Sequence, residues 1–459
     1  MANMEMLSIA LLSLLAAVGS RATSNDIPDD NTYVYGQQWV LLVAGTKGWS
    51  SYRHQADIAH SYQIAINNGI PGENIIVMMY NDVVNSTKNP APGTMINQPD
   101  GQDVYGDIII DYSGEDVTVE NFIKILTGDS DGMKGIGSGK VIESTMFDNV
   151  FVNLESLGVN GLVVFPSGEF LYGDQLNSAL EEMSNNYKFK KMLIYLDSSN
   201  SGSMFDGQLP SDKKILAMTA SNPREGSYAC YCGEESGEYR TCLGNLFSTT
   251  WMENINKSLS DKRRAIYKDY EDIRTAVTWS NVMMYGDFGV SLSPFSAFMG
   301  NPSDKISHYI NYSPKQNVES SKEGASISID VGLKKKLDVS ERLQLQKQIL
   351  YNRKMRLTVD KVFRQIYKKV VKEWPELADK AGDIQNPAVL QLTANDYPCY
   401  RSIVNRISSK CFFIDQDTYA LSQLPVFANF CVIDNEIDSK IAQTIDDICS
   451  KVKIPKHLE

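Results

Sequence analysis

The sequence has little histidine and no excess of basic residues. Only 4 of its 459 residues are histidine and no CxxC pair accompanies them, so neither a zinc site nor any other metal or cofactor is expected. The 44 Lys and Arg residues are outnumbered by 56 Asp and Glu, which argues against nucleic acid as a partner because phosphate binding needs a basic surface. Beyond the N-terminus, no apolar run is long enough to span a membrane. With 42% hydrophobic and 22% charged residues, the composition is that of an ordinary globular protein.

The N-terminus carries an apolar run that is too short for a membrane span. The run covers residues 7–18 and is followed by small residues up to Ala22. This pattern predicts a signal peptide over residues 1–22 and a place in the secretory pathway. In a secretory protein, the sequons at Asn85 and Asn256 are candidate glycosylation sites.

Seven cysteines fall into groups along the chain. Cys232 and Cys242 flank a short polar loop, and Cys230 is left over. The remaining four are Cys399, Cys411, Cys431 and Cys449. Disulfides are expected in a secretory protein, but the sequence alone does not choose among the three connectivities that four cysteines allow.

Strand and helix patterns alternate through the first 250 residues. Continuous apolar runs predict buried strands, and apolar residues at helical spacing predict the helices between them. Predicted strands cover residues 39–44, 74–80, 149–154, 162–165, 191–196 and 215–220, and predicted helices cover 53–68, 118–126 and 174–187. This alternation predicts an α/β fold with a mainly parallel sheet, whose site lies beyond the carboxyl ends of the strands.

The composition changes near residue 290. Residues 291–330 are rich in Ser, Pro, Asn and Lys, and amphipathic helical spacing begins after them. We therefore expect an α/β domain over 33–290, a linker over 291–335 and an all-helical domain over 336–459.

Two acidic residues end adjacent predicted strands. Glu155 follows one strand and Asp197 follows the next. They are either a carboxylate pair able to act as a base or, in the more ordinary interpretation, hydrogen-bonded acids without a chemical role.

Several motifs occur in the same order as in one family of peptidases. Residues 52–57 read YRHQAD, residues 134–140 read KGIGSGK, and residues 222–230 contain NPRE and SYAC. The turn at residues 197–203 reads DSSNSGS, where that family has EACESGS. The matches cover nearly all of the chain after the signal peptide. The sequence therefore resembles the legumain family, the asparaginyl endopeptidases among the caspase-like cysteine peptidases.

The resemblance implies an architecture and a compartment. The fold would be a caspase-like α/β/α sandwich followed by an all-helical prodomain stapled by disulfides. The expected disulfides are Cys399–Cys431, Cys411–Cys449 and Cys232–Cys242. The protein would be secreted, lysosomal or vacuolar. Its partners would be peptides, protein substrates or inhibitors of the legumain type, together with its own prodomain.

The catalytic residues of that family are replaced. Ser199 stands at the position of the cysteine nucleophile and Leu157 at that of the histidine base. Ser51 replaces an asparagine that orients the histidine. A hydroxyl ionises less readily than a thiol, and leucine cannot accept its proton. Gly158 and the Ser199 amide would still form an oxyanion hole, so the resemblance implies a pseudoenzyme.

The pocket for the asparagine side chain is changed less. The resemblance assigns Arg53, His54 and Ser227 to it unchanged. Asp197 is one methylene shorter than the family's glutamate, and Asn245 replaces an aspartate. Two interpretations remain open, namely a weakened peptide-binding pocket and an Arg53 that only pairs locally.

The features that control the family's prodomain are also altered. The carboxylate–arginine pair that locks the prodomain is replaced by Asn200 and Ser422, and residues 334–339 contain no asparagine for cleavage. The leading hypothesis is non-catalytic binding of peptides, inhibitors or partners. The alternatives are an active vacuolar or lysosomal Asn-directed endopeptidase with atypical catalytic residues, and a folded relative without a ligand.

Overall fold

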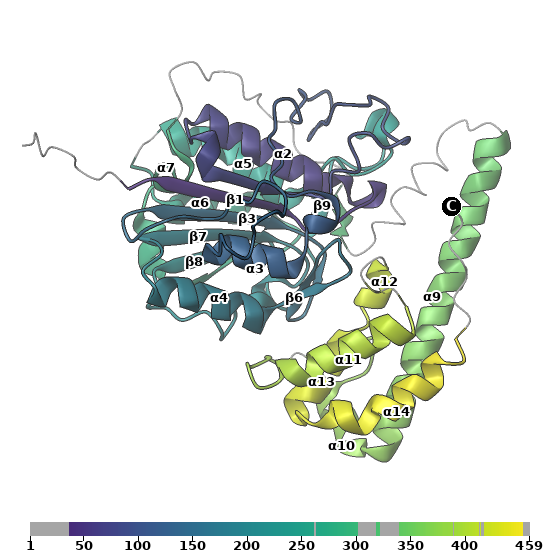
Figure 1. Cartoon of the computed structure of the whole chain (residues 1–459). Coiled ribbons are helices and arrows are strands. Elements are labelled where there is room, and N and C mark those ends of the chain that lie inside the picture. The colour runs from purple at the N-terminus through teal and green to yellow at the C-terminus, as the bar shows by residue number, and fades with distance from the viewer. Residues whose placement is uncertain are drawn as a thin grey trace, which may run out of the picture. The chain divides into compact units, whose positions relative to one another are not determined.

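The computed structural model (Figure 1) describes residues 36–260, 263–301, 318–321, 339–388, 390–412, 414 and 417–452. The predicted signal peptide lies outside the described residues, as do the side chain of Asn256 and most of the predicted linker. Among the residues described, no helix has both the length and the apolar character needed to cross a bilayer.

A six-stranded sheet forms the centre of the first half of the chain, in the order β11-β8-β7-β3-β1-β2. The strands are β1 (Gln38–Ala44), β2 (Ile75–Met78), β3 (Asn149–Glu155), β7 (Lys191–Asp197), β8 (Ile215–Thr219) and β11 (Met283–Gly286). Only β11, at one edge, runs antiparallel to its neighbour. Along β1, Val40 and Leu42 face one core while Leu41 and Val43 face the other, which explains the continuous apolar run.

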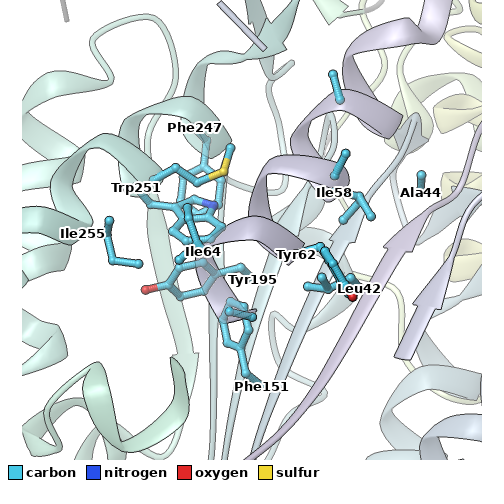
Figure 2. Close-up of a cluster of buried hydrophobic side chains, with 14 of the residues drawn as sticks. Leu42, Ala44, Ile58, Tyr62, Ile64, Phe151, Tyr195, Phe247, Trp251 and Ile255 are labelled. Carbon is cyan, nitrogen blue, oxygen red and sulfur yellow. The ribbon is translucent and has the colours of Figure 1, made fainter. Parts of the chain in front are cut away.

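Helices cover both faces of this sheet (Figure 1). One face carries α2 (Tyr52–Asn67), α5 (Leu246–Ser260), α6 (Ile266–Ala276) and α7 (Ser296–Met299), and the other carries α3 (Val119–Thr127) and α4 (Gly173–Asn185). In the core beneath α2 and α5 (Figure 2), Phe151 and Tyr195 from the strands lie edge-on to Trp251 of α5, with ring centroids 6.0 and 5.4 Å away. Aromatic rings favour this geometry because of their quadrupoles. The predicted α/β class is confirmed.

The α/β core extends past the change in composition near residue 290. A short 3-10 helix, η6 (Phe288–Leu292), follows β11, and Phe295, Phe298 and Met299 are buried in the core. The Phe295 ring stacks on Tyr195 with centroids 6.1 Å apart. The first part of the segment expected to be a linker therefore packs within the α/β core.

Two three-stranded antiparallel sheets accompany the main sheet. One contains β4 (Gly158–Val159), β5 (Leu162–Val164) and β6 (Phe170–Tyr172), and the other contains β10 (Gly244–Asn245), β9 (Tyr228–Cys230) and β12 (Glu319–Ser320). The predicted strand at residues 162–165 thus belongs to a small sheet, because it pairs with β6. The second small sheet brings a segment from far along the chain onto β9.

The last part of the chain is helical, as predicted, and residues 37–459 form one compact unit. Its helices are α9 (Val339–Glu373), α10 (Pro375–Ala381), α11 (Tyr397–Lys410), α12 (Thr418–Leu421), α13 (Pro425–Ile433) and α14 (Ile437–Cys449). The disulfides are Cys399–Cys431, Cys411–Cys449 and, in the α/β part, Cys232–Cys242. These are the three expected pairs, and Cys230 is buried and takes part in none of them.

Candidate functional site

Ser199 lies in a tight turn directly after β7. The next residue, Asn200, has left-handed backbone angles (φ 57°, ψ 23°), and a 3-10 helix, η4 (Ser201–Met204), follows it. The Asn200 amide donates to the Glu225 carbonyl at 2.8 Å. The Asn200 side chain donates to the Pro223 carbonyl at 2.9 Å. These bonds fix the turn at the carboxyl end of the strand, where α/β sheets place their sites.

Leu157 and Gly158 are brought against this turn from β3. The Ser156 amide donates to the Asp197 carbonyl at 3.0 Å, which ties the two strand ends together. A Cβ atom at Gly158 would lie 2.7 Å from the Ser199 carbonyl oxygen, so only glycine permits this approach. The structure therefore brings together the three residues predicted for the nucleophile, base and oxyanion positions.

The Ser199 hydroxyl has no base among the described residues. Its Oγ accepts a hydrogen bond from the Ser227 amide at 3.1 Å. Leu157 is almost fully buried among apolar residues. Ser51, the third altered position, precedes the first turn of α2 and makes no capping bond with its side chain.

Helix α12 covers the Ser199 turn. A cavity of about 10 Å³ is lined by Leu157, Gly158, Ser199, Ser321, Thr418, Leu421 and Ser422. That is about the space one water molecule occupies, so no peptide fits over Ser199 in this form. Ser422 lies beside the catalytic positions, as expected for the former lock, whereas the side chain of Asn200 bonds to Pro223 instead.

The helical region is attached by aromatic contacts. The Tyr172 ring of β6 lies edge-on to Tyr397 and Tyr400 of α11, with centroids 6.2 and 6.1 Å away. Arg401 lies 4.7 Å from the Tyr172 ring centroid and donates to both carboxylate oxygens of Asp174 at 2.8 and 2.9 Å. Leu157 belongs to the same apolar cluster. Leu157, at the position predicted for the base, thus packs in the cluster that attaches the helical region.

The chain's own segment at residues 318–321 occupies the edge of β9. Glu319 pairs with Ala229, and the Ser321 amide donates to the Ser227 carbonyl at 3.0 Å. The Ser321 side chain is buried, and its hydroxyl has no partner among the described residues. An extended segment therefore already runs beside Ser199.

Arg53 is the centre of the predicted substrate pocket and is 1% exposed. Its Nε donates to Asn245 Oδ1 at 2.8 Å, and its Nη1 donates to the Ser50 carbonyl at 3.0 Å. Its Nη2 has no partner among the described residues. Burial lowers the pKa of Arg53, while the charges of Asp197 and other nearby acids oppose that shift.

Three buried carboxyl groups surround Arg53. Asp57 accepts from the Asn97 side chain at 2.7 Å and from the Asn245 amide at 2.9 Å. Glu155 and Asp197 are joined through the Ser248 hydroxyl, and Asp197 Oδ1 has no partner among the described residues. Burial raises the pKa of all three carboxyls, that of Asp197 to about 6.

His54 is not available as a base for Ser199. Its Nδ1 lies 2.6 Å from Thr46 Oγ1 inside the protein. Burial lowers its pKa well below the usual range, and the neighbouring Arg53 charge adds to this effect. Ser227 donates its backbone amide to Ser199, and its side chain is near enough to Asp197 to favour the ionised form and so lower the pKa of that carboxyl.

The sequence did not point to several residues of the site. Asp57 was visible only as the last residue of the YRHQAD motif, and Ser248 follows Asn245 within one helical turn. Ser321 and Tyr172 carried no signal, because their roles depend on contacts between distant parts of the chain.

Comparison with known proteins agrees with the motifs. A match to the Peptidase C13 family covers residues 38–301. Legumain from Mus musculus is 38% identical over 96% of this chain and 98% of its own length. Vacuolar-processing enzyme from Citrus sinensis is 33% identical over 86% of this chain and 82% of its own length. Among solved structures, caspase-1 from Spodoptera frugiperda matches 55% of this chain and 86% of its own, with a TM-score of 0.32 and 10% identity. The extent of the sequence matches shows that the chain belongs to the legumain family of C13 peptidases.

Proposed function

We propose that this chain is a non-catalytic member of the legumain family that binds extended peptides without cleaving them. The observation that carries the proposal is the pairing of Leu157 with Ser199. The Ser199 hydroxyl accepts one hydrogen bond and has no base among the described residues to take its proton. A serine without a base stays protonated and is a weak nucleophile. Removing one member of a catalytic triad typically costs about 10⁴-fold or more in rate.

The proposed binding site is the edge of β9 together with the Arg53 pocket. Two observations support it. The chain's own residues 319–320 add to β9 as a strand, so this edge accepts an extended segment. Arg53 Nη2 and Asp197 Oδ1 are a buried donor and acceptor without partners among the described residues. The carboxamide of asparagine carries an acceptor and a donor, so it would satisfy both atoms.

Activity and binding are tested on the same protein. The full chain is incubated at acid and neutral pH with an Asn-containing fluorogenic peptide, beside a Ser199→Ala variant. We expect no turnover that depends on Ser199. Binding is followed by the fluorescence anisotropy of a labelled peptide, with the same peptide carrying Ala in place of Asn as control. Turnover abolished by Ser199→Ala would refute the pseudoenzyme, and equal affinity for both peptides would refute the pocket.

Opening the β9 edge should favour binding. Ser321→Pro removes the amide that donates to the Ser227 carbonyl, so the chain's own segment should leave β9 more readily. We expect tighter binding of the Asn peptide to Ser321→Pro than to wild type. Ser320→Ala keeps every backbone amide of the segment and serves as the matched control. An unchanged affinity in Ser321→Pro would show that the peptide binds elsewhere.

We also propose that the protein works in the secretory pathway, in a lysosome or vacuole or outside the cell. The expected signal peptide, the three disulfides and the relatives named after vacuolar processing support this location. Asn85 is exposed, as a glycosylated residue must be. Because a protein without proteolytic activity cannot process itself, the chain should stay full length after signal removal when incubated alone at acid pH. Conversion to a shorter form that is lost in Ser199→Ala would contradict this.

A further inference from the structure

The Ser248 hydroxyl lies between two buried carboxyl groups. Its Oγ is 2.6 Å from Glu155 Oε1 and 2.8 Å from Asp197 Oδ2. A serine hydroxyl has one proton and can donate it to only one of these oxygens. An ionised carboxylate only accepts hydrogen bonds, so two ionised groups cannot both be bonded to Ser248. One of the two carboxyls must therefore carry a proton and donate it to Ser248 Oγ.

The surroundings place that proton on Glu155. Asp197 Oδ2 also accepts from the Ser248 amide at 3.2 Å, and the Ser227 side chain and the Arg53 charge favour its ionised form. Glu155 instead faces the charges of Asp197 and Asp57, which disfavour its ionisation more than its bonds to Ser248 and Asn153 favour it. Burial raises the pKa of Glu155 well above the usual range, and the pKa of Asp197 rises only to about 6.

We propose that Glu155 is a positioning residue of the Arg53 pocket. As a neutral acid it donates to Ser248, Ser248 donates to Asp197, and Asp197 stays ionised at neutral pH as the acceptor that faces a bound side chain. The part of this proposal that concerns a bound side chain rests on the proposed function. The presence of a proton on one of the two carboxyls does not, because it follows from the bonds of Ser248, and its place on Glu155 follows from the bonds and charges around the pair.

Near Arg53, this chain carries a carboxyl group at position 155, whereas the resemblance implies one at position 245. By the resemblance, the family has Thr at position 155 and Asp at position 245, whereas this chain has Glu155 and Asn245. The two new side chains touch, since Asn245 Nδ2 donates to Glu155 Oε2 at 3.2 Å and to Asp57 Oδ2 at 2.8 Å. Arg53 thus lies near two carboxyl groups that accept hydrogen bonds from amides, Asp57 and Asp197, and near the neutral acid of Glu155.

Few titratable groups surround this arrangement. Helix α2 contributes Arg53 and Asp57, β3 contributes Glu155 and β7 contributes Asp197. Strand β9 contributes the thiol of Cys230, whose Sγ lies 3.2 Å from Thr249 Oγ1 on α5. The charge of His54 does not enter, because its ring is buried and its pKa is depressed.

Infrared spectroscopy locates the proton directly. At neutral pH the full chain should show the carbonyl stretch of a protonated, buried carboxylic acid. Labelling glutamate carboxyls with ¹³C should shift this band, and labelling aspartate carboxyls should not. The experiment uses the unaltered protein, so it does not depend on any variant folding. The absence of a band that shifts with labelled glutamate would overturn the proposal.

Two variants test the link to the pocket through the pH profile of binding. Glu155→Gln replaces the neutral acid by an amide that still donates to Ser248. The pH midpoint for binding the labelled Asn peptide should therefore stay within about half a unit of wild type. Ser248→Ala removes a donor to Asp197, so the midpoint should rise by roughly one unit.

If Glu155 were ionised, Glu155→Gln would remove a negative charge beside Asp197 and lower the midpoint by roughly one unit or more, which would overturn the proposal. Absence of any peptide binding would refute the proposed function alone. The infrared result would still decide the state of Glu155.

Discussion

The Arg53 pocket and the Ser199 cavity lie at the ends of the same two strands, yet their side chains differ in chemical character. Glu155 pairs in register with Asp197. Two residues further along each strand stand Leu157 and Ser199. The pocket is a network of buried charges and amides, whereas the cavity is closed by leucines and hydroxyls. The contrast teaches that the side chains of the predicted pocket and those of the predicted catalytic positions are separate sets, so that substitutions can change one set and leave the other in place.

The largest expected effect comes from removing the central charge of the pocket. Arg53→Met leaves buried carboxylates without their cation and should destabilise the protein by about 3 to 5 kcal/mol. Urea unfolding measures the loss. As control, Arg401→Met removes a partly exposed ion pair with Asp174 and should cost about 1 kcal/mol or less. Equal losses in the two variants would show that the pocket is no more dependent on charge than the surface.

The second effect is the pH dependence of stability that comes from Asp197. The folded-state pKa of Asp197, about 6, lies above its usual value of 3.8, so its contribution to stability is fully present below pH 4. The contribution is lost as the pH rises through about 6, because the unfolded chain then binds fewer protons than before while the folded chain resists ionisation.

Asp197→Asn should remove this dependence. Relative to wild type, the variant should gain roughly 2 to 3 kcal/mol of unfolding free energy between pH 4 and pH 7. Chemical denaturation at several pH values gives the difference. If the unfolding free energy of the variant fell relative to wild type as the pH rises, the pKa of Asp197 would be lowered in the folded protein and not raised.

The third test makes the cavity resemble the catalytic site of active relatives. Leu157→His buries a polar ring in an apolar contact and should cost about 2 kcal/mol. Ser199→Cys alone should not create activity, because no base is present. Both changes together should give slow cleavage after Asn, limited by Ser51 and by the neutral Asn245. Efficient cleavage by the single cysteine variant would show that Leu157 does not occupy the base position.

The smallest effect concerns the shape of the turn. Asn200→Ala puts a residue that disfavours positive φ at 57° and removes the bond to the Pro223 carbonyl, for a cost of about 1 to 2 kcal/mol. Asn200→Gly loses the same bond but tolerates the angle, so it should be less destabilised. Thermal unfolding of the two variants separates strain from hydrogen bonding. A more stable Ala variant would rule out strain in this turn.

The central sheet could be predicted because its signal is local. β1 and β3 are buried on both faces, so their apolar runs are continuous and nearly match the observed bounds. Strand β5 was predicted as a strand but was assigned to the main sheet, whereas it pairs with β6 in a small antiparallel sheet. The sequence of a three-residue strand does not indicate which strand it pairs with. Residues 295–299 were read as linker because their few apolar side chains show no period, yet they pack on the sheet.

The candidate site could be predicted only as far as motifs reach. Arg53, Ser199 and Leu157 were located by their place in ordered motifs. The relay from Glu155 through Ser248 to Asp197 joins residues up to 93 positions apart, and no local pattern reports such a contact. The same holds for Ser321, which enters the cavity from a segment with no regular pattern.

The tyrosine cluster that attaches the helical region carries a consequence for temperature. Burial raises the pKa of Tyr172, Tyr397 and Tyr400, so these rings stay uncharged even in mildly alkaline solution. Contacts of this kind depend on the release of water from apolar surface, and that driving force weakens on cooling. The cover over Ser199 should therefore loosen in the cold, so that a refrigerated sample exposes a surface that a warm one conceals.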